Sequence, residues 1–171
     1  MRKRFAPKRS LTAEWLNAAA WYRKKGLPRD AAQDDLARLV ALRIKSEGNI
    51  DDAVDAILSC WYDSELADKF LELMIVGRKA ESSMHVYLLA DQYTLYEKII
   101  GTIPAVSGAD GIFKEADLRR ALVKEFETKF PVMGRLSSAL HTLKNLGVVS
   151  DAGDDGRMRF SLYEYHFSNK E

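Results

Sequence analysis

The side chains best suited to contact a ligand lie on one side of a segment in the last third of the chain, residues 132–147. Apolar residues recur there every three or four positions, and the polar residues between them form a separate face. That face consists of Arg135, Ser138, His141, Thr142, Lys144 and Asn145. Arginine binds guanine through two hydrogen bonds, and asparagine, serine and threonine reach base edges or phosphates. The pattern favours contact with double-stranded DNA; protein contact and simple solvation are the alternatives.

Cations that could meet a phosphate backbone lie on both sides of this segment and at the N-terminus. They are Arg119, Arg120, Lys124, Arg157 and Arg159, together with Arg2, Lys3, Arg4, Lys8 and Arg9. We predict that residues 1–9 form a basic arm that lies along phosphates or in a minor groove. A frayed and solvated terminus is the alternative interpretation.

The turn near residues 151–156 carries an acidic charge that argues against phosphate contact at that point. Asp151, Asp154 and Asp155 would be repelled by a phosphate backbone. Either this turn stands away from DNA or the surface binds a protein. The second hypothesis for the function is therefore a protein-interaction adaptor within a larger complex.

The sequence patterns of common catalytic and metal sites are missing from the chain. His85, His141 and His166 have no second histidine or cysteine at metal-ligand spacing. There is no phosphate-cradling loop, dinucleotide fingerprint or HExxH motif. Cys60 lies in an apolar segment, where a core position is a better interpretation than a nucleophile. We expect no metal, no cofactor and no enzymatic activity; an enzyme whose site is assembled from scattered residues is the third hypothesis.

The overall charge of the chain is close to neutral, at +1 over 171 residues. DNA binding must therefore come from local patches rather than from the charge of the whole molecule. No apolar run approaches the roughly 18 residues of a membrane span, and no signal-peptide core follows the basic N-terminus. A single cysteine fits a reducing compartment. We expect a cytoplasmic protein without membrane association.

Helical periodicity predicts the element that positions the polar face. The apolar stripe of this helix consists of Leu136, Ala139, Leu140, Leu143 and Leu146. Gly147 ends the helix, because a residue without Cβ adopts positive φ at little cost. A strand begins at residues 148–149, a turn follows at 153–156, and alternation over 157–163 predicts a second strand.

The preceding elements are predicted to be mainly helical. The sequence predicts one long helix over residues 84–103, which Gly101 and Pro104 terminate. It also predicts a short strand at residues 112–113 and a further helix over residues 114–126. Residues 10–80 form a predicted bundle of three or four helices, with Gly48 and Asn49 between the second and the third. Residues 78–83 are the candidate boundary between two halves that pack together, and residues 164–171 form a tail that could pack back on the body.

The order helix, strand, helix, helix, strand, turn, strand over residues 84–163 resembles a winged-helix domain. The resemblance implies a mainly α fold, in which an N-terminal helical bundle precedes a C-terminal winged-helix domain with a small β-hairpin wing. The segment GRLSSALHTLKNLGVV is also similar to the BrxA family of BREX phage-defence accessory proteins. This likeness rests on Arg135, Ser137, Ser138, Leu140, Leu143, Leu146 and Gly147. It implies a non-enzymatic, DNA-binding accessory or regulatory protein.

Overall fold

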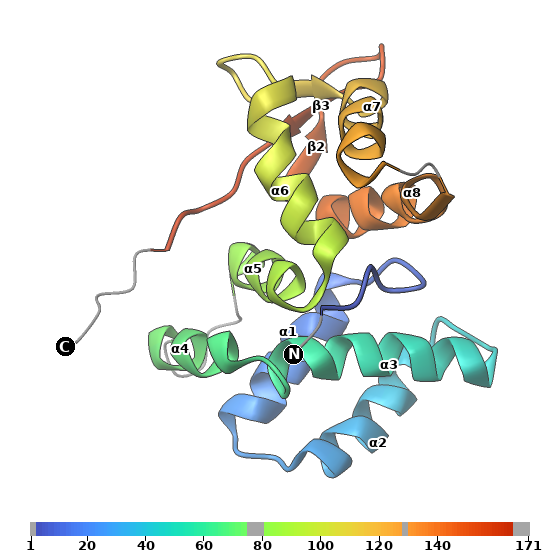
Figure 1. The fold of residues 1–171 in the computed structure, drawn as a ribbon. Coiled ribbons are helices and arrows are strands. Elements are labelled where there is room, and N and C mark those ends of the chain that lie inside the picture. Colours follow the sequence, from blue (N-terminus) through green and yellow to red (C-terminus); the bar gives the residue numbers. More distant parts are fainter. Residues whose placement is uncertain (1–2, 75–80, 128–129, 166–171) are drawn as a thin grey trace.

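The computed structural model describes residues 3–74, 81–127 and 130–165, and this part of the chain is mainly helical (Figure 1). It contains eight helices and three short strands. In chain order they are α1 Ala13–Lys24, α2 Arg29–Ala41, α3 Glu47–Trp61, α4 Glu65–Leu73, α5 Ser82–Gln92, α6 Thr94–Val106, β1 Ile112–Lys114, α7 Glu115–Phe126, α8 Phe130–Asn145, β2 Val149–Asp151 and β3 Arg157–Phe160.

The elements form two halves that share one hydrophobic core. Helices α1 to α4 lie at one end, α6 to α8 with the sheet lie at the other, and α5 lies between them (Figure 1). Leu16 of α1, Ile57 of α3 and Leu136 of α8 belong to a single cluster of buried side chains. The two halves therefore pack on each other, as predicted, although half of the predicted boundary at 78–83 lies outside the described residues.

Two helix starts in the N-terminal half follow local capping chemistry, whereas Ser46 before α3 makes no capping hydrogen bond through its side chain. Thr12 precedes α1, and its Oγ1 accepts a hydrogen bond from the backbone N–H of Trp15 at 3.3 Å. Ser64 precedes α4 and accepts from the N–H of Leu66 at 3.2 Å. One predicted boundary was wrong: α2 ends at Ala41, and both Gly48 and Asn49 lie inside the first turn of α3. The first turn tolerates such residues because the low helix propensity of glycine and asparagine is penalised mainly in a helix interior.

The long helix predicted over residues 84–103 is two helices that meet at Tyr93. Tyr93 is extended, with φ −131° and ψ 122°, and is buried. Residues 4–5 run beside it: the N–H of Arg4 donates to Gln92 O at 3.2 Å, and the N–H of Thr94 donates to Arg4 O at 2.8 Å. The N–H of Leu95 donates to the carbonyl of Phe5 at 2.9 Å. Carbonyls of the N-terminal segment thus satisfy the first amides of α6, which would otherwise be unpaired.

Helix α6 also continues past its predicted end. It includes Gly101 and Pro104 and stops at Val106. A proline in the last turn removes only one hydrogen bond of the helical ladder, so the helix persists there.

The three strands form an antiparallel sheet in the order β1-β3-β2. Phe113 faces Met158 across β1 and β3, and both side chains are buried under the helices. Gly147, with φ +73°, ends α8 as predicted and leads into β2. The predicted strand over 157–163 ends at Phe160.

Residues 161–165 then return toward α5. The N–H of Tyr163 donates to Ser83 Oγ at 3.0 Å, and the hydroxyl of Tyr165 donates to Glu81 Oε2 at 2.7 Å. The described part of the predicted tail therefore packs on the body of the protein.

Candidate nucleic-acid interface

Helix α8 carries two polar stripes that face different surroundings. The first stripe consists of Arg135, Ser138, Thr142 and Asn145, and it faces residues 8–11 of the N-terminal segment. Arg135 Nη1 donates to Lys8 O at 2.6 Å, Asn145 Nδ2 donates to Leu11 O at 2.9 Å, and the N–H of Leu11 donates to Thr142 Oγ1 at 2.9 Å. We call these four residues the docking stripe.

The docking stripe corrects part of the sequence prediction. Thr142 is completely buried, and its hydroxyl also donates to the carbonyl of Ser138 at 3.2 Å, so it contacts no external ligand in this conformation. Arg135 and Asn145 donate hydrogen bonds to backbone carbonyls of residues 8–11. The physical reason is that residues 8–11 precede α1 without forming a helix or strand, so their backbone groups need side-chain partners where they are covered.

The second stripe of α8 is exposed to solvent, and we call it the open stripe. It consists of Gly134, Ser137, His141 and Lys144. At 100° per residue, its centre lies about 140° around the helix from the centre of the buried leucine stripe. A Cβ built at Gly134 would meet nothing within 4 Å. Lys144 Nζ lies 2.7 Å from Asp151 Oδ1, and the sequence had identified only His141 and Lys144 of this stripe.

Residues 3–9 are packed against the protein rather than projecting as an arm. Lys3 lies 3.0 Å from the Glu97 carboxylate, and Lys8 lies 2.8 Å from that of Asp52. Arg4 pairs with Asp55 and hydrogen-bonds to Ser59, and its guanidinium lies over the ring of Tyr93.

Two cations of the predicted arm, Arg9 and Arg2, form none of these contacts. Arg9 is half-buried, and its guanidinium has no partner among the described residues. Arg2 lies outside those residues. The N-terminal segment therefore offers one unpaired cation, Arg9, within the part of the chain that the structure describes.

The cations on α7 differ in how free they are. Arg119 pairs with Glu115 one turn earlier, and Arg120 lies 3.1 Å from Asp117. Lys124 is exposed and has no partner within the described ranges. Exposed pairs within one helix contribute little stability, so Arg120 can exchange Asp117 for a phosphate at small cost. Lys124 can bind a phosphate without giving up a partner in the described part of the chain.

The cations on the sheet share its outward face. Arg157 Nε lies 2.8 Å from Asp155 Oδ1, and this guanidinium lowers the pKa of the Asp155 carboxyl. Arg159 is exposed and unpaired among the residues described. Lys114, which the sequence had not singled out, lies directly opposite Arg157 in the register of β1 and β3.

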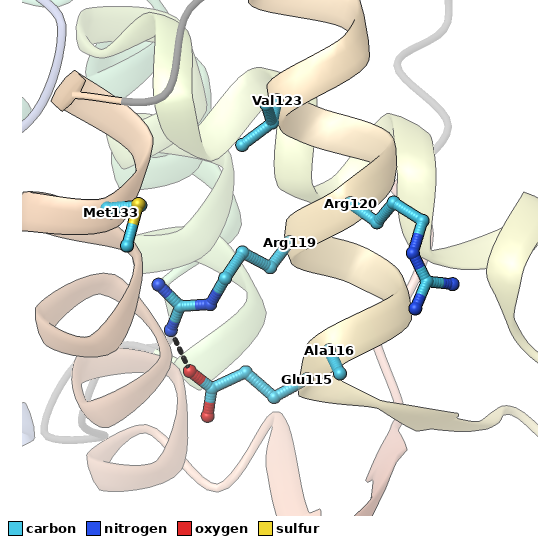
Figure 2. Close-up of a pocket in the computed structure, with 6 residues that line it drawn as sticks. All are labelled: Glu115, Ala116, Arg119, Arg120, Val123 and Met133. Atoms are coloured by element: carbon cyan, nitrogen blue, oxygen red, sulfur yellow. Dashed lines mark hydrogen bonds and ion pairs between the residues drawn. The ribbon is translucent and has the colours of Figure 1, made fainter.

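A shallow apolar hollow of about 510 Å³ lies between α7 and α8 (Figure 2). It is lined by Glu115, Ala116, Arg119, Arg120, Val123 and Met133. The Arg119 side chain extends toward Met133 of α8, while Arg120 extends to the other side of α7 (Figure 2). Met133 is 56% exposed at the edge of this hollow. The sequence analysis had not predicted this hollow.

Of the candidate histidines, His85 and His141 have opposite environments. His85 is buried; its Nδ1 accepts from Trp61 Nε1 at 3.1 Å, so its Nε2 carries the hydrogen that is donated to Asn17 Oδ1 at 2.9 Å. Burial lowers the pKa of His85 to about 3, and the ring is neutral at pH 7. His141 is exposed on the open stripe, and His166 lies outside the described residues.

Comparisons with protein-family models, with curated proteins and with solved structures found no significant match. None of the helices that the structure describes combines the length and the apolar content that crossing a bilayer requires.

Proposed function

We propose that this protein is a non-enzymatic accessory or regulatory protein that binds double-stranded DNA through its C-terminal half. The observation that carries the proposal is the open stripe of α8, a polar helix face that remains uncovered after both halves have packed. His141 and Lys144 on this stripe have the chemistry to contact base edges and phosphates in a major groove.

The arrangement around α8 supports the proposal. The elements follow the order α6, β1, α7, α8, β2, β3, and the sheet has the order β1-β3-β2. This is the order expected of a winged-helix domain, in which α8 would be the recognition helix and the β2–β3 hairpin the wing. Under this proposal Lys124 and Arg120 of α7 and Arg9 of the N-terminal segment add phosphate contacts.

The resemblance to the BrxA family gives the proposal a biological setting. We infer that the DNA-binding protein acts in the cytoplasm, as an accessory component of a BREX-like phage-defence system. The segment that carries this likeness includes Ser137 of the open stripe, together with Arg135 and Ser138 of the docking stripe.

Fluorescence anisotropy with a duplex of about 30 base pairs, titrated across salt, tests the proposal. We expect micromolar or tighter binding that weakens with log[salt], at a slope of about −0.9 per phosphate contacted. The double variant His141→Ala/Lys144→Gln should bind at least about tenfold more weakly, because both changes remove contacts from the open stripe.

The control is Lys45→Gln, which removes an exposed cation in the connection between α2 and α3. This variant should bind as the wild type does. Absence of duplex binding at low salt, or equal affinity of the open-stripe double variant, would reject the proposal.

Two simpler tests are poorly suited to this fold. Deletion of residues 1–9 removes the carbonyls of Arg4 and Phe5 that bond to the first amides of α6, as well as cations. Substitution of Arg135 breaks its bond to Lys8 O. Either change would alter the packing of the two halves, so a loss of DNA binding would not identify a DNA contact.

The apolar hollow between α7 and α8 favours a second candidate function, a protein-interaction adaptor. An exposed methionine beside an apolar depression suits the anchor side chain of a protein partner. Cross-linking of wild type and Met133→Asp to candidate partners tests this function. The adaptor function would be the better conclusion if the wild type forms a specific cross-link that Met133→Asp loses, and if the wild type also fails to bind duplex DNA.

A further inference from the structure

The face of the three-stranded sheet that is turned away from the helices carries a cluster of three cations. Side chains alternate between the two faces of a strand. Phe113 and Met158 are buried on the inner face, so their strand neighbours Lys114, Arg157 and Arg159 project from the outer face. Lys114 lies opposite Arg157, and Arg159 lies two residues along β3 on the same side.

This arrangement does not serve the stability of the sheet. Like charges directly opposite each other on neighbouring strands are destabilising. The side chains of Lys114 and Arg159 have no partner among the described residues, whereas most cations predicted as ligand contacts are paired with acids or carbonyls.

The neighbouring carboxylates lie at the ends of the strands rather than on this face. Asp155 in the β2–β3 turn holds Arg157 Nε, and Asp110 before β1 accepts from the N–H of Ile112 at 3.1 Å. Opposite Arg159 on β2 is Ser150, an exposed hydroxyl that can donate to a phosphate. The middle of the outer face therefore combines three cations, of which Arg157 is paired with Asp155, with the partly exposed side chain of Ile112 opposite Arg159 and the neutral donor Ser150.

The outer face of the sheet and the open stripe of α8 belong to opposite sides of the C-terminal half. The core of this half lies between them, because the inner face of the sheet and the leucine stripe of α8 both point into it. Phe113, Met158 and Leu140 are all buried in that core. Where the open stripe meets the sheet, β2 presents Asp151, which pairs with Lys144 and repels a phosphate backbone, so this contact does not lead a duplex on the open stripe to the outer face.

We propose that the outer face of the sheet binds the phosphate backbone of a second nucleic-acid segment, so that one molecule bridges two duplexes. The inference rests on the proposed function, which supplies the first duplex at the open stripe. Lys114, Arg157 and Arg159 hold the phosphates of the second duplex and read no sequence, since they contact only its backbone.

The test uses two duplexes of about 30 base pairs and unrelated sequence, one biotinylated and one fluorescent. The wild type on streptavidin beads that carry the first duplex should capture the second. The variant Lys114→Glu should bind a single duplex within about threefold of wild type but capture at least about tenfold less of the second, because one phosphate contact is lost and a repelling carboxylate takes its place. Lys45→Glu, the same charge reversal at an exposed cation after α2, is the matched control and should bridge normally.

Each outcome decides between the two proposals. Single-duplex binding without bridging by the wild type, or unchanged bridging by Lys114→Glu, overturns the bridging inference and leaves the proposed function intact. No duplex binding at all overturns both. Lys114 lies on the edge strand β1, where a charged side chain can also serve only to prevent sheet pairing between molecules. Self-association of Lys114→Glu in light scattering, with bridging unchanged, would assign Lys114 that role instead.

Discussion

Replacing Gly134 with alanine separates the contribution of α8 to stability from its contribution to binding. Gly134 lies within the helix on the open stripe, and a Cβ there would meet nothing within 4 Å. Glycine in a helix costs about 0.5–1 kcal/mol relative to alanine. Gly134→Ala should therefore increase the free energy of unfolding by that amount and raise the Tm by roughly 1–4 °C for a chain of this length.

Under the proposed function the same substitution should weaken DNA binding. The added methyl group stands between the backbone of α8 and a groove wall that packs against the open stripe. A single methylene too many in a well-packed contact costs about 1–3 kcal/mol. We expect duplex affinity to fall roughly fivefold to a hundredfold in the anisotropy titration, as the stability rises.

Gly101→Ala is the matched control for this experiment. Gly101 is an exposed glycine inside α6, and a Cβ there also meets nothing within 4 Å. This variant should gain similar stability in urea unfolding and bind DNA as the wild type does. If Gly134→Ala is stabilised and binds duplex DNA normally, no partner approaches α8 closely at this point. If Gly134→Ala is destabilised, the assignment of open space around Gly134 is wrong.

Three further predictions concern stability. Between about pH 6.5 and pH 3 the unfolded chain binds a proton at His85 that the folded protein does not, so the free energy of unfolding is highest above this window and falls with acidification by up to about 1.4 kcal/mol per pH unit. Urea unfolding at several pH values should show a shallower pH dependence of this free energy for His85→Gln than for the wild type. Parallel pH dependences would contradict the buried neutral ring. Thr142→Val keeps the shape of the side chain but leaves the N–H of Leu11 without its acceptor, so it should lower the free energy of unfolding by about 1–3 kcal/mol in a denaturant titration. A decrease below about 0.5 kcal/mol would count against the docking stripe. Gly147→Ala places a Cβ at φ +73° and should cost about 1–2 kcal/mol, whereas an unchanged Tm would show that the turn accepts another conformation.

Local patterns in the sequence predicted most elements because local physics determines them. The hydroxyls of Thr12 and Ser64 begin α1 and α4, and Gly147 ends α8 with the left-handed conformation that its position requires. The alternation around Met158 predicted the strand that completes the sheet. In each case the residues that cause the structure lie within a few positions of it.

The failures have causes that lie far away in the sequence. The helix break at Tyr93 depends on hydrogen bonds to residues 4–5, and the local periodicity of a sequence does not reveal such distant contacts. The division of the polar face of α8 depends on Leu11, 131 residues from Thr142. Side-chain chemistry adds to the difficulty, because arginine, asparagine and threonine bond to a backbone carbonyl or amide as readily as to a base or a phosphate. A sequence pattern therefore predicts that such residues bind, but not whether their partner is internal.

The N-terminal segment also constrains when the fold can be completed. Its contacts with α8 join residues 127 to 134 positions apart, from Lys8 with Arg135 to Leu11 with Asn145. During synthesis residues 8–11 leave the ribosome long before their partners on α8. The N-terminal helices can associate early, while residues 8–11 lack their partners on α8. Translation of α8 is thus the step that completes the fold. A chain interrupted before residue 135 leaves the carbonyls of Lys8 and Leu11 and the N–H of Leu11 available to chaperones or to other chains.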